Sequence, residues 1–435
     1  MSRIAVIGAG YVGLTSGVCF GSLGHDVVVA DIDADRIESL SAGRAPIFEA
    51  GLEPMMVELL GSGRLRFVLG ASSAIVDAEF VFLCLPTPQS DEGSADLSYI
   101  EAAAAEIAPR LRPGAIGVNK STVPIGAAGL VRELIDRPDI EVASNPEFLK
   151  EGSAIADFLS ADRIVIGAPT REVAIRVASL YVGVEAPVIV TDPTSAEMIK
   201  YASNAFLATK LSFVNALAEL CELAGADITD VVNGMGRDRR IGREFLRPGP
   251  GFGGSCFPKD TSALIRIAEG LGAEFPLLAA TLSINARQGQ RVLDKVDLLS
   301  PAGLAGCRVG VLGLAFKAGT DDLRDSPALA VVELLAAAGA VITAHDPAIS
   351  ASPQAMRNPR LASLVESGLT LVADAYEPAR DADVLVVLTE WGEYRDLAVD
   401  KLVELMAQPA VVDTRNLLDR DTFQRRGFRF LGTGR

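Results

Sequence analysis

The sequence contains few of the residues that most often build metal sites and disulfide frameworks. Its 435 residues include only five cysteines and two histidines, and no two cysteines form a C-x-x-C pair. A structural zinc site and a disulfide framework both need such residues at close spacing. We therefore predict neither of them, and no bound metal.

An excess of positive charge is also absent. Lysine and arginine number 40 against 56 aspartates and glutamates, which gives a formal net charge of −16. Such a chain has no general electrostatic attraction for nucleic acid or anionic lipid. Nucleic acid and membranes are therefore not expected as partners, and any phosphate-binding site must be local.

No segment resembles a secretory signal or a membrane span. The first three residues lead directly into an apolar run at 4–7 and a glycine turn. The longest weakly polar stretch, residues 327–344, contains Glu333 and is interrupted by Gly339, a pattern typical of a helix followed by a strand. We expect a cytoplasmic protein.

Apolar residues make up 49% of the chain and charged residues 22%, which is typical of a globular protein with large buried interfaces. The first 190 residues alternate short β-branched runs with amphipathic stretches, the pattern of a parallel sheet covered by helices. The expected strands are residues 4–7, 26–30, 80–85, 115–119, 141–144, 163–167 and 188–191. We predict a doubly wound domain here.

The pattern then changes twice. Between residues 195 and 297 the β pattern disappears, and apolar residues recur at helical spacing at 197–224 and 260–271. The α/β rhythm restarts with expected strands at 308–312, 341–344, 382–388 and 410–413 and a helix at 326–338. The predicted fold class is α/β, with two Rossmann-like doubly wound domains (1–194 and 301–435) joined by a central helical domain (195–300).

A glycine-rich turn follows the first expected strand. In the sequence Gly8-Ala9-Gly10-Tyr11-Val12-Gly13, the first glycine permits a tight turn, the second lets a pyrophosphate approach the backbone, and the third lets helix and strand pack closely. The N-terminus of the helix that follows supplies amides and the positive end of a dipole. This context predicts a dinucleotide site rather than a purely structural turn.

Asp31 ends the next strand, about 20 residues further on, where a carboxylate accepts a bond from a ribose 2′-hydroxyl and repels a 2′-phosphate. Arg36 lies nearby and is of the type that accommodates a 2′-phosphate, but the carboxylate should dominate. We predict NAD rather than NADP as the cofactor.

A second glycine-rich segment, residues 248–260, contains four glycines and ends in Ser255-Cys256-Phe257-Pro258-Lys259-Asp260. Pro258 fits the first turn of a helix, so Cys256 would lie at a helix N-terminus. The helix dipole and Lys259 favour the thiolate, the form that attacks a carbonyl carbon. Asp260, one turn on, is a candidate acid, base or water-positioning group.

The other four cysteines lie in apolar runs and are expected to be small buried side chains. They are Cys19, Cys84, Cys221 and Cys307. Cys256 is therefore the one cysteine that we predict to be catalytic.

The chain resembles the UDP-glucose/GDP-mannose dehydrogenase family over essentially its whole length. Seven ordered motifs carry this resemblance, at residues 8–15, 121–124, 145–152, 200–206, 251–260, 313–317 and 325–328. It implies a four-electron oxidation of a sugar C6 alcohol to a carboxylate with two NAD in succession. Cys256 would form a thiohemiacetal and then a thioester, which water releases as the uronate.

The resemblance also implies roles for individual residues. Lys200, Asn204 and Thr122 would hold or polarise the oxygen at C6, and Asp260 and Glu147 would handle protons and water. An ammonium and an amide aimed at developing negative charge suit this step. Taken alone, Lys200 and Asn204 are one helical turn apart and could equally be solvated, and Thr122 and Glu147 could serve in local turns and caps.

Two larger sets are implied by the resemblance. The residues expected near NAD are Gly8, Gly10, Val12, Gly13, Asp31, Arg36, Thr87, Thr122, Glu151, Lys259 and Arg324. The residues expected near the nucleotide sugar are Glu147, Phe148, Leu149, Lys150, Glu151, Lys200, Asn204, Arg240, Phe245, Leu246, Arg247, Pro248, Gly249, Gly253 and Lys317, with Arg415 as a further candidate. Arg240 resembles an arginine contributed across a subunit interface, and a homodimer is implied.

The form of residues 256–260 is more similar to the UDP-glucose branch of the family than to the GDP-mannose branch, and we expect UDP-glucose as the substrate. Ala216 stands where many relatives carry a glutamate, which removes no residue assigned to chemistry. Three alternatives stay open: a 6-dehydrogenase of GDP-mannose or another nucleotide sugar, a single-hydride 3-hydroxyacid dehydrogenase on a similar scaffold, and a catalytically silent NAD-binding protein.

Overall fold

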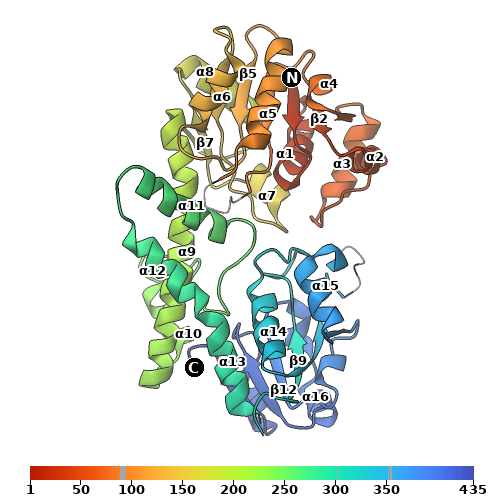
Figure 1. Ribbon diagram of the computed structural model, residues 1–435, viewed down its shortest axis with the longest axis vertical. Helices are drawn as coiled ribbons and strands as arrows, with labels where there is room; N and C mark the ends of the chain where they lie inside the picture. The colour runs from red at the N-terminus through yellow and green to blue at the C-terminus, as the bar shows by residue number, and fades with distance from the viewer. Residues whose placement is uncertain (89–94, 301, 351, 353–354) are drawn as a thin grey trace. The chain divides into compact units, whose positions relative to one another are not determined.

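The computed structural model describes residues 1–88, 95–300, 302–350, 352 and 355–435 (Figure 1). The chain forms two compact units, one of residues Met1–Ser203 and Arg266–Gly272, the other of residues Asn204–Ile265 and Ala273–Arg435. Two of the three boundaries fall within the long helix α9 (Pro193–Ala224) and within α11 (Phe257–Gly270), and the third follows α11, between Gly272 and Ala273.

The first unit is built on an eight-stranded sheet in the order β3-β2-β1-β4-β5-β6-β7-β8. The strands are β1 (Arg3–Ile7), β2 (Asp26–Asp31), β3 (Leu65–Leu69), β4 (Phe80–Leu83), β5 (Ile116–Asn119), β6 (Glu141–Ser144), β7 (Ile164–Gly167) and β8 (Val188–Thr191). Among the described residues all neighbouring strands pair in parallel except β6 and β7. The order of the first six is that of a doubly wound dinucleotide-binding fold.

Helices cover both faces of this sheet, as the alternation in β1 requires. Ile4 and Val6 face one apolar cluster, which includes residues of α1, α3 and α8, whereas Ala5 and Ile7 face another, with residues of α5 and α6. The helices are α1 (Tyr11–Ser22), α2 (Ala34–Ser41), α3 (Leu52–Gly61), α4 (Ala71–Ala74), α5 (Ser98–Ile107), α6 (Ala127–Ile135), α7 (Ala154–Leu159) and α8 (Arg171–Ala178).

The second unit contains a six-stranded parallel sheet in the order β11-β10-β9-β12-β13-β14, which repeats the doubly wound order. Its strands are β9 (Arg308–Leu312), β10 (Val341–His345), β11 (Thr370–Leu371), β12 (Val384–Val387), β13 (Ala410–Asp413) and β14 (Arg429–Gly432). The helices of this unit besides α9 and α11 are α10 (Ile228–Met235), α12 (Pro276–Ala286), α13 (Gln288–Leu299), α14 (Pro327–Ala337), α15 (Pro359–Glu366), α16 (Val399–Leu405) and α17 (Arg420–Arg425).

The predicted fold class is confirmed: there are two doubly wound sheets, and the described residues between them form only helices and loops. The weakly polar stretch at 327–344 is α14 followed by β10, as expected, and none of the helices in the described part of the chain is long and apolar enough to cross a membrane. The sequence reading missed β3, β11 and β14, and it extended β4 two residues too far, because the chain turns away after Leu83.

Candidate active site

The turn between β1 and α1 has the geometry that its glycines predicted. Gly8 has φ +101°, and a Cβ there would overlap the Cys84 carbonyl, while a Cβ at Gly13 would overlap the Gly8 carbonyl. A Cβ at Gly10 would meet no protein atom within 4 Å. The fold itself therefore requires the first and third glycines, whereas the second leaves the backbone open to a pyrophosphate, so the turn fits a dinucleotide.

Asp31 ends β2 and faces this turn. Its carboxylate accepts a bond from the Ala9 amide at 2.8 Å and from the Asp33 amide at 3.1 Å. The Arg36 guanidinium pairs with the same carboxylate at 3.1 Å. Arg36 is thereby engaged with the acid predicted to accept the ribose hydroxyls, which accords with a preference for NAD over NADP.

The first sheet reverses its strand order between β1 and β4, and ligands of such sheets bind at the carboxyl ends of the strands at that point. Thr87 follows β4 there and is buried. Its hydroxyl donates to the Thr122 carbonyl at 2.9 Å, so the segments after β4 and β5 are tied together. Val12 lies in the first turn of α1 and is half-buried.

A buried ion pair joins the loop after β6 to α9. The Lys200 ammonium lies 2.8 Å from a Glu147 carboxylate oxygen, and both side chains are less than a tenth exposed. The other oxygen of Glu147 accepts the Leu149 amide at 2.7 Å. Burial alone would raise the pKa of Glu147, but the ammonium and this amide outweigh it and hold that pKa below its usual range.

The neighbouring residues of this loop have distinct partners. The Phe148 ring lies under the Arg163 guanidinium, 3.9 Å from the ring centroid, and 5.5 Å from the Lys200 ammonium. The exposed Lys150 pairs with Asp157 at 3.0 Å. The first unit thus brings together Glu147, Phe148 and Lys200 but leaves the Lys150 side chain in solvent.

One contact of this loop was not foreseen. The buried carboxylate of Glu49 accepts the amides of Gly152 and Ala154, each at 2.9 Å, and bonds the Tyr11 hydroxyl of the dinucleotide turn. Burial and the bond to Glu49 raise the pKa of Tyr11 above its usual range. Glu49 precedes Gly152 and Ala154 by more than a hundred residues, and no local pattern marks it.

Cys256 lies where its sequence context predicted. It immediately precedes α11, and its carbonyl accepts the Asp260 amide at 2.8 Å, the first bond of that helix. Its sulfur is 3.5 Å from the Ser255 hydroxyl, and the residue is partly exposed. A thiol at a helix N-terminus that solvent reaches is placed for nucleophilic attack.

The remaining four cysteines are all buried, as expected. Burial raises the pKa of Cys19 and of Cys84 to about 12, and it also raises that of Cys307. These thiols are held in the unreactive neutral form at ordinary pH. Cys256 is thus the one cysteine whose surroundings suit catalysis.

Asp260 is fully buried within the first turn of α11. The Asn204 amide of α9 donates to its Oδ2 at 2.6 Å, and the Lys259 ammonium lies 3.0 Å from its Oδ1. A buried carboxylate with both oxygens engaged is oriented firmly, one turn away from Cys256. The second unit therefore brings together Cys256, Asp260, Asn204 and Lys259.

The glycine-rich segment before Cys256 is held in place by side chains of two helices. Gly249 donates to the Asn215 carboxamide oxygen of α9 at 2.8 Å, and Phe252 exchanges two bonds with Asn285 of α12. Gly253 packs so closely that a Cβ would overlap the Asp325 carbonyl. Leu246, Pro248 and Gly249 are buried, Phe245 is half-buried with φ +60°, and Arg247 is exposed.

Arg240 lies outside any enclosed site in this chain. It pairs with Asp238 at 2.7 Å, and its side chain is 89% exposed. Arg324 is also exposed and pairs with Asp322 at 2.7 Å, while its carbonyl accepts the Gly254 amide at 3.1 Å. Neither arginine is enclosed by residues of its own unit.

The second sheet reverses its order between β9 and β12, and the residues at that point differ from those of the first sheet. Asp346 occupies the place of Asp31 but is fully buried. Its carboxylate accepts the amides of Leu314 and Ala315 at 2.7 and 2.9 Å, the Ala348 amide at 3.0 Å and the Trp391 indole at 3.1 Å. This carboxylate fixes the loop that leads to the half-buried Lys317.

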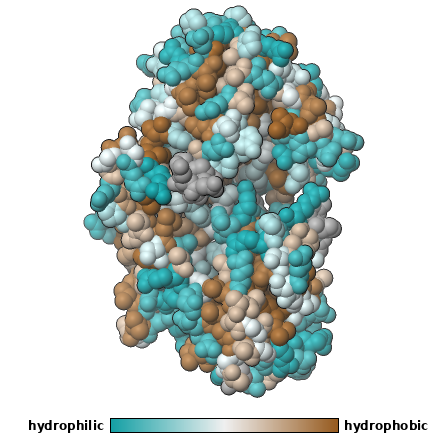
Figure 2. All heavy atoms as spheres, viewed as in Figure 1, coloured by the Kyte–Doolittle hydropathy of each residue, from teal (hydrophilic) through white to brown (hydrophobic). Residues whose placement is uncertain are grey.

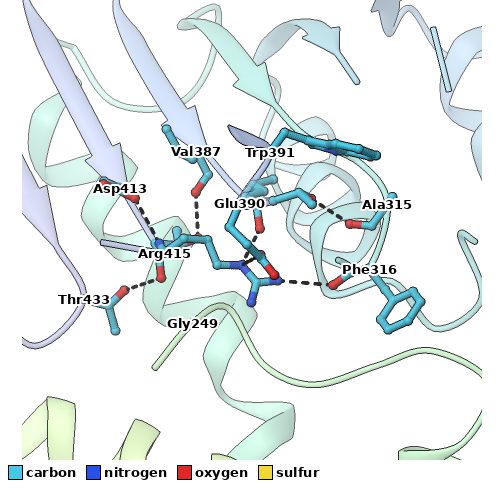
Figure 3. Close-up of polar contacts among 12 residues, drawn as sticks. Gly249, Ala315, Phe316, Val387, Glu390, Trp391, Asp413, Arg415 and Thr433 are labelled. Atoms are coloured by element: carbon cyan, nitrogen blue, oxygen red, sulfur yellow. Dashed lines mark hydrogen bonds and ion pairs between the residues drawn. The ribbon is translucent and has the colours of Figure 1, made fainter. Parts of the chain in front are cut away.

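Arg415 follows β13 at the same end of the sheet (Figure 3). Its guanidinium donates to the Leu388 carbonyl at 2.8 Å and to the Phe316 carbonyl at 3.3 Å, and it pairs with Glu390 at 3.1 Å. Its Nη1 lies 3.0 Å from the position of a Cβ on Gly249, so the guanidinium packs closely against this glycine. The second unit thus joins Arg415, the loop 245–249 and the loop before Lys317.

The predicted residues are divided between the two units. Those of the first unit are Gly8, Gly10, Val12, Gly13, Asp31, Arg36, Thr87, Thr122, Glu147, Phe148, Leu149, Lys150, Glu151 and Lys200. Those of the second unit are Asn204, Arg240, Phe245, Leu246, Arg247, Pro248, Gly249, Gly253, Cys256, Lys259, Asp260, Lys317, Arg324 and Arg415. Lys200 and Asn204 lie one turn apart on α9.

Comparison with known proteins gives consistent results along the whole chain. Three models of the UDP-glucose/GDP-mannose dehydrogenase family match, namely its NAD binding domain at residues 2–185, its central domain at 194–287 and its UDP binding domain at 310–420. A curated relative from Rhizobium meliloti (strain 1021), named UDP-glucose 6-dehydrogenase, is 45% identical over 444 residues that cover 100% of this chain and 99% of the relative.

Two further relatives agree with this. UDP-glucose 6-dehydrogenase TuaD from Bacillus subtilis (strain 168) is 42% identical and covers 100% of this chain, with 94% of its own length matched. The solved structure of a UDP-glucose dehydrogenase from Pyrobaculum islandicum superposes with a TM-score of 0.89 at 39% identity, covering 100% of this chain and 98% of that one.

Proposed function

The chain belongs to the UDP-glucose/GDP-mannose dehydrogenase family, and we propose that it oxidises UDP-glucose to UDP-glucuronate with NAD. The observation that carries the proposal is Cys256, the one partly exposed cysteine, at the N-terminus of α11 and one turn from a buried carboxylate. An enzyme that oxidises an alcohol only to an aldehyde or ketone needs no such thiol. An enzyme that oxidises an alcohol to a carboxylate can use the thiol to bind the aldehyde covalently before the second oxidation.

NAD is the cofactor of this family, and the turn after β1 fits it. Gly8, Gly10 and Gly13 would hold its pyrophosphate against the N-terminus of α1, and Asp31 its ribose. Val12, Arg36, Thr87, Thr122, Glu151, Lys259 and Arg324 complete the proposed cofactor set. When bound, NAD accepts the hydride that leaves C6 in each of the two oxidations.

The chain's own groups stabilise charge at the C6 oxygen in the first oxidation. We assign this role to the Lys200 ammonium and the Asn204 amide, which lie one turn apart on α9, with Thr122 as a further donor. The hydroxyl proton passes to solvent as the alcohol becomes an aldehyde. Donors whose positions are already fixed by Glu147 and Asp260 stabilise this charge without reorganising.

Cys256 then forms a bond from sulfur to C6, and the aldehyde oxygen takes up a proton to give a thiohemiacetal. Loss of the second hydride and of the hydroxyl proton yields a thioester. Water attacks this thioester, the carbon–sulfur bond breaks, the thiol regains its proton and the uronate is released. Asp260, oriented by Asn204 and Lys259, is placed to accept a proton from this water, and Glu147 assists.

The nucleotide part of the substrate would bind to the second unit. The residue set proposed for it comprises Phe245, Leu246, Arg247, Pro248, Gly249, Gly253, Lys317 and Arg415, and the family resemblance adds Glu147 to Glu151. Lys317 and Arg415 supply local positive charge for a diphosphate on an acidic chain. We accordingly assign cofactor binding to residues 1–194, a helical core to 195–300 and nucleotide-sugar binding to 301–435.

We further propose that the protein is a homodimer that pairs through α9. Phe206, Phe213 and Leu220 recur every seven residues on this helix, and each is more than half exposed. Apolar side chains, drawn in brown in Figure 2, reach the surface of the molecule in several places. An apolar stripe of this kind on one helix is typical of a protein–protein contact. Arg240, exposed in this chain, would then reach a partner's site.

Phe213→Glu should shift the molar mass measured by light scattering from dimer to monomer, because it places charge in the middle of the stripe. A change of an exposed residue outside the stripe, Ile175→Glu, is the control. An unchanged mass for Phe213→Glu would contradict pairing through this face.

We also propose that the enzyme works in the cytoplasm. The catalytic role proposed for Cys256 requires a reduced thiol. Reducing compartments keep thiols in this state.

The test of the proposed function is the amount of NADH formed per nucleotide sugar consumed. Two NADH for each UDP-glucose, and none with GDP-mannose, are expected. One NADH per sugar would indicate a single-hydride dehydrogenase, and none with either sugar a silent binding protein. Cys256→Ala should abolish uronate formation and Cys256→Ser should stall at a slow stage, whereas Cys221→Ala, which changes a buried cysteine, should retain the two-to-one ratio.

A further inference from the structure

A short segment, residues 432–434, begins with the last residue of β14 and is hydrogen-bonded to distant parts of the second unit. We call it the clasp segment. On one side it holds Asn416, the residue directly after Arg415: the Asn416 amide donates to the Thr433 carbonyl at 2.8 Å, and the Thr433 amide donates back at 3.1 Å. The Thr433 hydroxyl also donates to the Thr414 carbonyl at 3.0 Å (Figure 3).

These bonds fix the backbone on both sides of Arg415. Asn416 has φ +50°, a left-handed conformation that costs free energy in a residue with a side chain. Its two reciprocal bonds to Thr433 stabilise that conformation. The direction in which the Arg415 side chain leaves the backbone therefore depends on the clasp segment.

On its other side the clasp segment is anchored to three helices. Gly434 donates to the Glu222 carboxylate of α9 at 2.7 Å, and its carbonyl accepts the Ile228 amide at the start of α10 at 2.9 Å. The Lys295 ammonium of α13 donates to the Gly432 carbonyl and pairs with Glu222, both at 2.5 Å. Gly434 has φ +76°, and a Cβ on it would lie 2.6 Å from that of Ile228.

The loop that faces Arg415 is anchored to the same helix. Gly249, against which the Arg415 guanidinium packs, donates to the Asn215 side chain of α9. Asn215 and Glu222 are seven residues apart, which is about two helical turns on one side of the helix. Both walls of the proposed nucleotide site are thus positioned by a single rigid element, one directly and the other through the clasp segment.

We propose that the clasp segment positions Arg415 against the loop 245–249 and so sets the affinity for the nucleotide sugar. This inference rests on the proposed role of Arg415 at the nucleotide. Thr433, Gly434 and Glu222 are positioning residues, because they touch neither the substrate nor the reacting atoms.

The primary test is Gly434→Ala. The added methyl group must displace the segment from Ile228, because glycine alone tolerates this conformation and this close approach. The matched control is Gly427→Ala, since Gly427 also has a positive φ (+87°) but a Cβ there meets nothing within 4 Å. Calorimetry with UDP and with NAD, and steady-state kinetics with UDP-glucose, are the measurements.

For Gly434→Ala we expect the Kd for UDP and the KM for UDP-glucose to rise about tenfold or more, because a charge-assisted contact of Arg415 is lost. The Kd for NAD and kcat should stay within about twofold of the wild type. The Gly427→Ala variant should match the wild type in all four quantities. A loss confined to kcat, or equal losses for UDP and NAD, would overturn the inference.

A second pair of variants keeps the test decisive if Gly434→Ala does not fold. Thr433→Val removes the bond to the Thr414 carbonyl, and Thr433→Ser restores it. Weaker UDP binding by Thr433→Val and wild-type binding by Thr433→Ser would support the positioning role of the clasp segment. Equal UDP binding by the two variants would refute it.

Arg415→Met separates this inference from the role of Arg415 itself. If Arg415→Met weakens UDP binding and the clasp variants do not, the clasp inference is wrong while Arg415 retains its role. If Arg415→Met leaves UDP binding unchanged, the role of Arg415 and the inference fail together. The ratio of two NADH per UDP-glucose would still test the overall function separately.

Discussion

Replacing Lys200 with methionine should destabilise the first unit strongly. The ammonium lies 2.8 Å from the Glu147 carboxylate, and the two side chains are 5% and 7% exposed. Removal of one partner leaves a buried charge without compensation, which typically costs about 3–5 kcal/mol. We expect the free energy of unfolding to fall by about 3 kcal/mol, at the lower end of this range. The Leu149 amide and the positive charge of Lys120 still stabilise the Glu147 carboxylate in the variant.

The size of this loss should depend on pH in a defined direction. In the folded wild type the pKa of Glu147 lies below its value in the unfolded chain. Ionised Glu147 therefore adds to the free energy of unfolding at pH values above the unfolded pKa, and this contribution is lost as pH falls through the folded pKa. In Lys200→Met, burial is no longer opposed by that ammonium and raises the Glu147 pKa. The destabilisation of the variant should therefore be largest near neutral pH and shrink as pH falls and Glu147 takes up a proton.

Urea unfolding of wild type and variant at several pH values measures this effect. The control is Lys150→Met, since Lys150 also pairs with an acidic residue, Asp157, at 3.0 Å but is 60% exposed. The free energy of unfolding of this control should fall by less than about 1 kcal/mol. The double variant Lys200→Met with Glu147→Gln should recover part of the stability. A loss of equal size at all pH values, or one no larger than that of Lys150→Met, would refute the reasoning.

Two further predictions concern the dinucleotide turn. Asp31→Ser should raise the efficiency with NADP relative to NAD by about tenfold or more, because it removes the carboxylate and releases Arg36 for a 2′-phosphate; an unchanged ratio of kcat/KM values would contradict this. Gly10→Ala should weaken NAD binding in calorimetry with little change in Tm. Gly13→Ala should instead lower Tm, because its Cβ overlaps the Gly8 carbonyl. If the two variants lowered Tm equally, the fold would require both glycines alike, contrary to this prediction.

The sequence predicts every strand that lies inside a sheet, but among the edge strands it predicts only β8. β1, β4, β9 and β12 are buried on both faces, so they are continuous apolar runs, and a glycine directly follows β1 and β9. The missed strands β3, β11 and β14 are all at sheet edges. An edge strand buries fewer side chains, and polar residues such as Arg66, Thr370 and Arg429 interrupt its pattern.

The candidate site divides in a similar way. Local motifs predict the glycine turn at 8–13, Asp31 and Cys256, because each depends on neighbours within one strand–turn–helix unit. The contacts of Glu49 with the loop at 152–154, and of Glu222 with Gly434, join residues 103 or more positions apart. No spacing along the chain reveals such contacts, since they depend on how the helices pack.

The two sheets share one strand order, yet only the first retains the chemistry of a dinucleotide site. Asp31 accepts the Ala9 and Asp33 amides, pairs with Arg36 and is partly buried, whereas Asp346 accepts four donors from its own chain and is fully buried. A ribose diol therefore finds no acceptor in the second sheet. One architecture thus occurs twice within the chain, and the two copies differ in how far the acid at the carboxyl end of the second strand of each order is withdrawn from solvent.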